Sequence, residues 1–285
     1  MTSVHLGFDM GIRNLAYCLV RHITAETWEI VAWDNIDLLE GGASAQDAKK
    51  CVACTGSAKW IYTDGKKWCQ GCATGVRRKK TVTEKPTVGA LPCAVNVKEL
   101  KALATTQGVD TKGMKKEDLV TWASGRYLMP WKAVKAMDTS LSVIRKAMDT
   151  WLTTVLPTFV QASLIRLENQ PVMKGPTMKS VQMILFTLLA HRLEKEHGWT
   201  GRIEFVHAGT KSKGTKGTVP AVADISGAVV ADVTEGAAYR ARKKTAESDV
   251  VDLLTKGAMA TWLTFFEGRS KKSDLADALL MAVRH

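Results

Sequence analysis

The stretch Val4-His5-Leu6-Gly7-Phe8-Asp9 decides how this chain folds. Its largely apolar run is typical of a buried strand, and the run ends on a carboxylate. An aspartate at the end of a central strand projects into the crevice beyond the sheet, where it can bind a hard cation. Gly11 then turns the chain, and two further strands are expected over residues 15–20 and 28–33. Three short strands joined by tight turns make a meander.

Helices and strands alternate in the second half of the chain. Further strands are expected over residues 163–168 and 203–206. Amphipathic or apolar patterns predict helices over residues 137–160 and 180–197, two helical segments within roughly 236–267, and a last helix that starts near Ser273. Once the segments in between are set aside, the order favours an α/β fold in which helices flank a mixed sheet.

Three more acids occupy positions comparable to that of Asp9. Glu168 ends the expected strand over residues 163–168, and Asp274 and Asp277 lie one turn apart on one face of the last helix. Carboxylates from strand ends and a facing helix can hold two divalent cations, Mg²⁺ or Mn²⁺, and such a pair promotes in-line displacement at phosphorus.

Three of the four acids also have a simpler structural explanation. Asp9 could cap the turn before Gly11, and Glu168 could pair with a lysine. Asp274 could follow Ser273 as N-cap, in a first helical turn where the dipole favours an acid. The coincidence of all four acids in suitable strand and helix contexts favours the metal site.

The overall charge indicates a polyanionic partner. The chain has 285 residues, 46% of them hydrophobic, a net charge of +12 and a pI of about 9.4. Such a balance favours nucleic acid as the partner, although charge that serves only solubility is the alternative. No apolar run of membrane-spanning length occurs, so no membrane partner is expected. The N-terminal residues resemble no secretory or transit signal, so an intracellular location is expected.

Four of the six cysteines form two Cys-x-x-Cys pairs. Cys51 and Cys54 are followed, after 14 residues, by Cys69 and Cys72. Two such turns can complete a tetrahedron of thiolates around a structural Zn²⁺, with no open position for catalysis. Trp60, Tyr62 and Trp68 between the pairs indicate a small β-hairpin. Unliganded buried cysteines or a redox disulfide are the alternatives.

Residues 97–122 form a separate helical unit. Gly108 and Gly113 separate two short amphipathic helices, and the pattern resembles a SAP motif, a small DNA-binding helix-linker-helix. The resemblance implies DNA-backbone contacts by Lys112, Lys115 and Lys116 near the start of the second helix, where free amides also favour phosphate. A generic helical hairpin with solvated lysines is the alternative.

Two other basic segments could contact DNA phosphates. One is a glycine-rich loop that lacks a P-loop signature, so no nucleotide cofactor is expected; the other lies in a predicted helix. The candidate DNA-binding residues of these segments are Lys211, Lys213, Lys216, Arg240, Arg242, Lys243 and Lys244. Contacts of this kind position a protein on DNA rather than read its sequence.

Three sequence blocks together resemble a known enzyme family. Residues 8–18 (FDMGIRNLAYC), 167–170 (LENQ) and 271–280 (KKSDLADALL) are similar to the RuvC-type Holliday junction resolvases, above all to the poxvirus and mitochondrial branch. The basic run 239–244 also resembles that branch. The resemblance covers residues 3–40 and about 135–285. It implies an RNase H-like fold, a homodimer and Mg²⁺-dependent cleavage of four-way DNA junctions, with a viral source in host cytoplasm or nucleus.

The resemblance also implies roles for the four acids. Asp9, with Asp277 or Asp274, would hold the metal ion that activates water, and Asp9 with Glu168 would hold the second ion at the leaving 3′ oxygen. Cleavage then leaves a 5′-phosphate and a 3′-hydroxyl. The implied organisation is a nuclease core over residues 1–40 and 131–285, interrupted by a zinc ribbon (41–76), a basic linker (77–94) and the SAP-like module (95–130).

Two other functions fit parts of the sequence. One is another RNase H-like nuclease, which acts on RNA–DNA hybrids or is guided by RNA. Nucleases of the transposon-encoded type carry their ribbon between the second and third acidic blocks, whereas here the cysteines lie between the first and second, which counts against that function. The other is a non-catalytic architectural DNA-binding protein, against which the presence of all four acids counts.

Overall fold

The computed structural model describes residues 2–24, 26–54, 56–74, 96–170, 176–206 and 231–284, with only the backbone for 231–240. The chain divides into two compact units. Unit 1 comprises Met1–Gln46 and Ala136–His285, and unit 2 comprises Asp47–Lys135.

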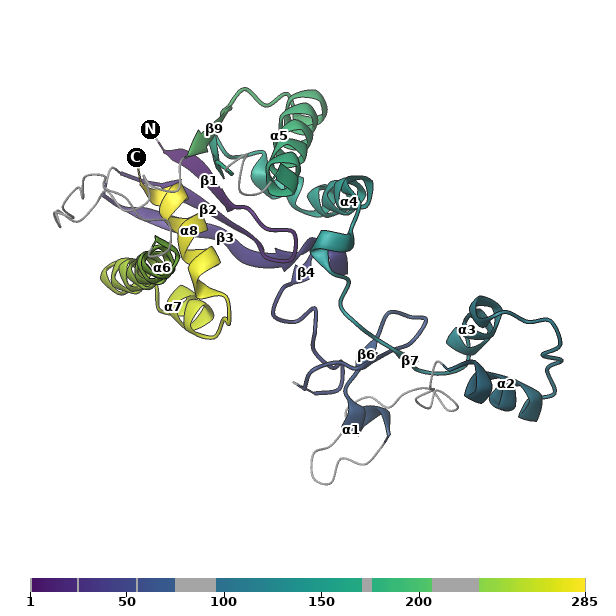
Figure 1. Cartoon of the computed structure of the whole chain (residues 1–285). Coiled ribbons are helices and arrows are strands. Elements are labelled where there is room, and N and C mark those ends of the chain that lie inside the picture. Colours follow the sequence, from purple (N-terminus) through teal and green to yellow (C-terminus); the bar gives the residue numbers. More distant parts are fainter. Residues whose placement is uncertain are drawn as a thin grey trace. The chain divides into compact units, whose positions relative to one another are not determined.

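A six-stranded mixed sheet forms the centre of unit 1 (Figure 1), which confirms the predicted mixed α/β class. Its strand order is β4-β3-β2-β1-β8-β9; β1 to β4 pair antiparallel, and β8 and β9 continue the sheet parallel to β1. The strands are β1 (Ser3–Asp9), β2 (Leu15–His22), β3 (Trp28–Asp37), β4 (Ala43–Ser44), β8 (Leu164–Glu168) and β9 (Arg202–Val206).

Helices cover both faces of this sheet. On one face lie α4 (Leu141–Phe159) and α5 (Pro176–His197), and on the other α6 (Ala231–Lys256), α7 (Ala260–Glu267) and α8 (Lys272–Val283). Side chains alternate along each strand, so Leu6 and Phe8 pack in the core beneath α4 and α5, while Ala16 and Cys18 pack beneath α8. The sheet is therefore buried on both faces. The edge at which the parallel strands β1, β8 and β9 end, called the carboxyl edge below, remains as the natural place for a site.

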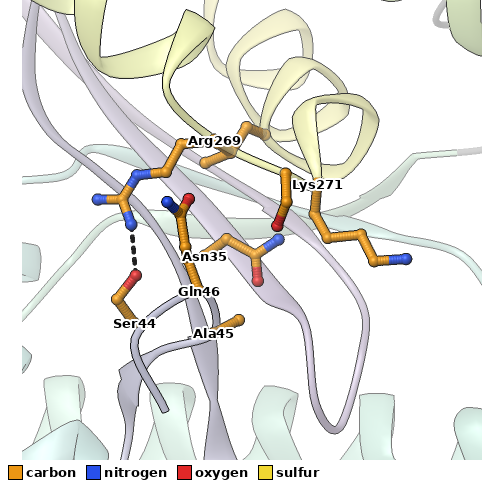
Figure 2. A pocket seen from close by; sticks show the side chains of 8 residues that line it. Asn35, Ser44, Ala45, Gln46, Arg269 and Lys271 are labelled. Carbon is orange, nitrogen blue, oxygen red and sulfur yellow. Dashed lines mark hydrogen bonds between the residues drawn. The ribbon is translucent and has the colours of Figure 1, made fainter. Parts of the chain in front are cut away.

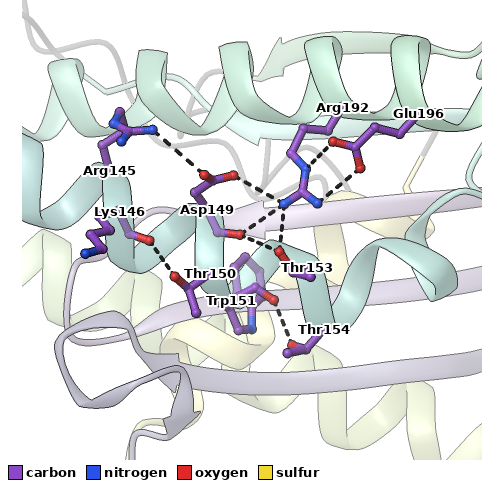
Figure 3. Close-up of polar contacts among 9 residues, drawn as sticks. All are labelled: Arg145, Lys146, Asp149, Thr150, Trp151, Thr153, Thr154, Arg192 and Glu196. Atoms are coloured by element: carbon purple, nitrogen blue, oxygen red, sulfur yellow. Dashed lines mark hydrogen bonds and ion pairs between the residues drawn. The ribbon is translucent and has the colours of Figure 1, made fainter.

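A polar network joins α4 to α5 (Figure 3). The Arg192 guanidinium donates to the carbonyl and carboxylate oxygens of Asp149 at 3.0 and 3.2 Å, and to Glu196 one turn further along α5. Arg145 lies 3.8 Å from the same aspartate. The side chain of Arg192 is only 14% exposed, so these contacts are partly shielded from solvent. They hold the two helices in register on the sheet.

The Gly41-Gly42 pair forms a tight turn, although two consecutive glycines are also typical of a linker. Both glycines adopt positive φ, 71° and 77°, after the short 3-10 helix η1 (Leu38–Glu40), and they return the chain so that β4 pairs with β3. A Cβ on Gly42 would lie 2.5 Å from the Trp151 ring. Positive φ favours glycine at both positions, and at Gly42 a side chain would also clash with Trp151 of α4.

The described part of unit 2 contains a three-stranded sheet and three helices. The sheet has the order β6-β5-β7, with β5 (Trp60–Ile61), β6 (Lys67–Trp68) and β7 (Met129–Pro130), next to the short helix α1 (Gln70–Ala73). The antiparallel β5–β6 pair confirms the predicted hairpin. Helices α2 (Val97–Thr106) and α3 (Lys116–Ser124) pack through Leu100, Ala104, Leu119 and Ala123, all fully buried.

Among the described residues, the helices are all too short or too polar to cross a membrane.

Candidate functional site

Asp9 and Glu168 leave the sheet at the same edge. They end β1 and β8, which are adjacent parallel strands in which Phe8 faces Leu167, so the two acids are the next pair in register. Neighbouring strands lie about 4.8 Å apart. Because Phe8 and Leu167 point into the core beneath α4 and α5, the two acids point to the face covered by α8. Both are half-buried.

Helix α8 crosses β1 at very close range. A Cβ on Gly7 would lie 2.3 Å from the carbonyl oxygen of Ala278, so only glycine allows this approach. Near the start of β1, His22 Nε2 lies 3.0 Å from the carbonyl oxygen of Ala282. The residues that precede Ala278 therefore run toward the carboxyl edge of the sheet. This direction brings Asp274 and Asp277, both half-buried, to the edge where β1 and β8 end.

Asp274 has two polar neighbours. Its Oδ1 lies 3.3 Å from Nζ of Lys243 on α6 and accepts a hydrogen bond from the Ser273 hydroxyl at 3.1 Å. Lys243 also donates to that hydroxyl at 3.1 Å. Ser273 is not the N-cap, which was the simpler alternative for Asp274, because α8 begins at Lys272 with Lys271 as N-cap and no capping side chain. Asp274 lies in the first turn, where the helix dipole stabilises a negative charge.

The donor set fits hard divalent cations. Four carboxylates come from two strand ends and one helix, which is the oxygen-rich environment that Mg²⁺ and Mn²⁺ prefer. Among the described residues, these acids do not form a cluster of three or more side chains that is compact enough to ligate one ion. Two metal ions about 3.5–4 Å apart distribute their ligands over a longer span than one ion does. Four carboxylates that do not converge on one point are therefore compatible with a pair of metal ions.

Two glutamines that the sequence did not single out as functional support the β8 end. Gln182 on α5 is fully buried; its Nε2 donates to the carbonyl oxygen of Glu168 at 2.9 Å, and its Oε1 accepts from the Gln170 amide at 3.3 Å. Gln170 Nε2 in turn donates to Glu168 Oε2 at 3.0 Å. A glutamine on the apolar face of the predicted helix, beside Val181 and Leu185, was the available signal.

The four cysteines of unit 2 converge on one point. The Sγ atoms of Cys51, Cys54, Cys69 and Cys72 all lie within 4.8 Å of one another, and the structure records no disulfide between them. Cys54 Sγ lies 3.6 Å from Cys69 Sγ and 3.7 Å from Cys72 Sγ. A tetrahedral zinc with Zn–S bonds of about 2.3 Å separates its sulfurs by about 3.8 Å. The four cysteines could therefore bind a metal such as zinc.

Backbone amides surround this cluster. The Gly56 amide donates to Cys54 Sγ at 3.3 Å, and the Cys72 amide to Cys69 Sγ at 3.4 Å. Burial opposes ionisation of Cys54, but the Gly56 amide and the neighbouring thiols outweigh it and lower its pKa to about 7. Burial raises the pKa of Cys51. Amide donors of this kind orient thiolates around a metal and stabilise their charge.

The candidate DNA-contacting residues fall into three groups. Lys112, Lys115 and Lys116 are exposed around the start of α3, where the Lys115 amide donates to Asp118 at 2.9 Å. Arg242 and Lys244 are exposed on α6, whereas Lys243 points to Asp274. The remaining candidates lie outside the described residues or side chains: Lys211, Lys213, Lys216 and Arg240.

Comparison with known proteins gives one structural likeness. No family model matches the sequence, and no curated protein matches it. The crystal structure of the yeast mitochondrial Holliday junction resolvase Ydc2 is similar, with a TM-score of 0.42 and 12% identity over 99% of this chain and 78% of that chain. This overlap is too loose for residue roles to be transferred from that protein to this one.

Proposed function

We propose that this chain is a metal-dependent, structure-selective endonuclease of the RuvC-type Holliday junction resolvase family, with an RNase H-like core. The observation that carries the proposal is the shared sheet edge, where Asp9 and Glu168 end adjacent parallel strands and α8 leads Asp274 and Asp277 toward them. The resemblance of the three acidic sequence blocks to that family supplies the substrate, a four-way DNA junction.

In this proposal the four acids hold two Mg²⁺ or Mn²⁺ ions. When bound, such ions supply an activated water and charge stabilisation at the attacked phosphorus. Asp9 would contribute to holding both ions, Glu168 would help to hold the ion on the leaving-group side, and Asp274 or Asp277 the ion that supplies the activated water. Gln182 and Gln170 hold Glu168 at the strand end through the hydrogen bonds described above. The products are a 5′-phosphate and a 3′-hydroxyl.

Lys243 keeps Asp274 in place through its 3.3 Å contact. An ammonium at this distance offsets the repulsion that clustered carboxylates would otherwise feel. On substrate binding the same charge lies beside the phosphate, so its expected DNA-binding role and its ion pair with Asp274 are compatible. Arg242 and Lys244 extend the positive charge along the exposed side of α6.

Unit 2 is proposed to be a DNA-binding insertion. Its cysteines form a zinc ribbon in which the metal is structural, because four thiolates leave no open coordination position. Its helical hairpin serves as a SAP-like module, with Lys112, Lys115 and Lys116 exposed near the start of α3 to contact backbone phosphates. The functional protein is proposed to be a homodimer, because two copies match the two-fold symmetry of a four-way junction.

The decisive experiment compares Asp9→Asn with wild type on an end-labelled four-way junction, linear duplex, RNA–DNA hybrid and single strand, each with Mg²⁺ and with EDTA. We expect wild type to make paired symmetric nicks on the junction alone. We expect Asp9→Asn to bind the junction without cutting it. The control is Asp252→Asn, the same substitution at an exposed position of α6, which should cleave like wild type.

Other outcomes point to other functions. Cleavage of the hybrid would indicate a ribonuclease. Tight junction binding by wild type with no metal-dependent nick would indicate an architectural protein. Retained cleavage by Asp9→Asn would refute the proposed site.

A further inference from the structure

A small pocket lies beside the start of α8 (Figure 2). Its volume is about 10 Å³, which is room for one water-sized group. It is formed by β3, β4 and the segment that leads into α8. The lining residues are Asn35, Ser44, Ala45, Gln46, Arg269, Ser270, Lys271 and Leu275.

The floor of the pocket is a buried amide without a partner. Asn35 is 4% exposed, and neither its Oδ1 nor its Nδ2 has a hydrogen-bond partner within the described part of the chain. Its backbone is engaged in the sheet, since its carbonyl accepts from the Ala45 amide at 2.8 Å. Gln46 Oε1 is also buried without a partner. Buried polar atoms of this kind are normally satisfied, so the pocket is suited to a polar group from outside.

The charge of the lining favours an anion. Arg269 and Lys271 lie on opposite sides of Asn35 in Figure 2, and the lining contains no carboxylate. Arg269 donates to the Ser44 hydroxyl, stacks over Phe265 and lies 3.4 Å from Asp34, so its guanidinium is held in place but partly neutralised. Lys271 is exposed at the rim.

The start of α8 strengthens this preference. Its N-cap provides no side-chain hydrogen bond, so first-turn amides are not capped from that position, and the positive end of the helix dipole lies here. An uncapped helix start next to a buried, unpartnered amide and two cations is suited to an oxygen with negative charge.

The pocket has a defined place relative to the candidate metal site. Asp9 pairs with Ala16, and Ala16 pairs with Asn35, so the three residues form one row across β1, β2 and β3. Residues paired in this way point to the same face of the sheet, the face that α8 covers. Two strand spacings separate Asp9 from Asn35, which is about 10 Å. The two sites therefore lie on either side of the start of α8.

We propose that this pocket binds a backbone phosphate of the DNA strand that is being cut, one that flanks the scissile phosphate. The inference rests on the proposed function. A pocket of about 10 Å³ admits one non-bridging oxygen and excludes a base. Asn35 Nδ2 and the Ser270 hydroxyl donate to that oxygen, and Lys271 balances its charge at the rim. The contact sets the register of the strand relative to Asp9 without reading sequence.

The test combines a variant with a chemically neutral phosphate. Junctions that carry a single methylphosphonate at successive positions around the cleavage site are bound without added Mg²⁺ or Mn²⁺, so that binding is measured without cleavage and the zinc of unit 2 is retained. Wild type should lose affinity on the order of tenfold when one flanking position is neutral, as expected for a hydrogen bond to a charged group. Asn35→Asp, which places a carboxylate against the phosphate, should bind the unmodified junction on the order of tenfold more weakly.

The two changes should not add. In Asn35→Asp the same methylphosphonate should cause no further loss, because the contact is already gone. The matched control is Gln161→Glu, which introduces the same charge at an exposed position before the amino end of β8; it should retain the full methylphosphonate effect. Thermal unfolding of both variants identifies any loss of affinity that comes from misfolding.

Failure of the inference and failure of the proposed function give different results. If wild type cuts junctions but no methylphosphonate position depends on Asn35, the pocket binds only water and the inference is wrong. If wild type cuts nothing but one position still depends on Asn35, the phosphate site stands and the proposed nuclease function is wrong. Full methylphosphonate effects in Asn35→Asp would also overturn the inference.

Discussion

Substitution of Gly7 by alanine should uncouple the helical acids from the strand acids. The added Cβ would lie 2.3 Å from the Ala278 carbonyl oxygen and 2.9 Å from the Ala282 amide nitrogen. Both atoms belong to the helix backbone, so no side-chain rotation can relieve the clash. Since an ordinary contact begins at 3.4 Å, the helix must move by roughly 1 Å away from β1.

This displacement acts on stability and on catalysis through separate quantities. Overpacking of this kind costs about 1–3 kcal/mol in the free energy of unfolding, measured by urea denaturation. A displacement of about 1 Å within a catalytic site can lower the rate about 100-fold. The rate is measured as single-turnover cleavage of a four-way junction with saturating Mg²⁺, under conditions where the variant is fully folded.

A control variant separates these effects from a general effect of added methyl groups. Gly125→Ala changes a glycine with φ of −75°, where the nearest atom is 4.0 Å from the new Cβ, and it should cleave and unfold like wild type. If Gly7→Ala cleaved within threefold of the wild-type rate while folded, then the close approach of α8 to β1 would not position the acids. The reasoning that links this contact to the site would then be refuted.

Three further predictions concern other parts of the chain. Cys54→Ser should lower the zinc content measured by mass spectrometry from one ion per chain to a small fraction, because one thiolate of four is lost; unchanged zinc would contradict the assignment. Arg13→Met removes the cation 2.7 Å from the fully buried Asp37 and should cost about 3–5 kcal/mol at pH 7. Burial raises the pKa of Asp37 above 3.8, although Arg13 acts to lower it. The folded state therefore binds a proton more readily than the unfolded state, and the stability falls as pH rises through the pKa of the folded state. Loss of Arg13 raises the pKa further, and the destabilisation seen in urea titrations should therefore shrink as the pH falls toward 3.8; a pH-independent loss would exclude this cause. Arg192→Leu removes the bridge to Asp149 and should cost about 1–3 kcal/mol, with junction affinity unchanged.

The local patterns were sufficient for most elements of the core. The apolar run that ends at Asp9 forms β1, the next two predicted strands form β2 and β3, and helices α4 and α8 lie close to where their periodicity places them. These elements bury a continuous apolar face, so composition and period suffice to identify them. The strand β3 extends to Asp37, beyond the predicted end at 33, because pairing with β2 and β4 continues there.

The differences arise where neighbours distant in sequence decide. Gly41 and Gly42 have the composition of a linker, yet contact with α4 makes them a turn. Ser273 is a residue type typical of an N-cap, yet α8 begins before it, and the Ser273 hydroxyl donates a hydrogen bond to Asp274. Local composition is the same for both outcomes in each case, and only the packing of another element distinguishes them.

Some residues of the candidate sites can be identified from the sequence, and others only from the tertiary structure. The four acids and the four cysteines could be named from the sequence, because carboxylates at strand ends and paired Cys-x-x-Cys turns have distinctive spacing. The buried Gln182 behind Glu168 and the unpartnered Asn35 in the row of Asp9 could not be assigned a role. Their importance comes from burial and strand register, which exist only after the sheet has formed, and an isolated glutamine or asparagine in a sequence carries neither.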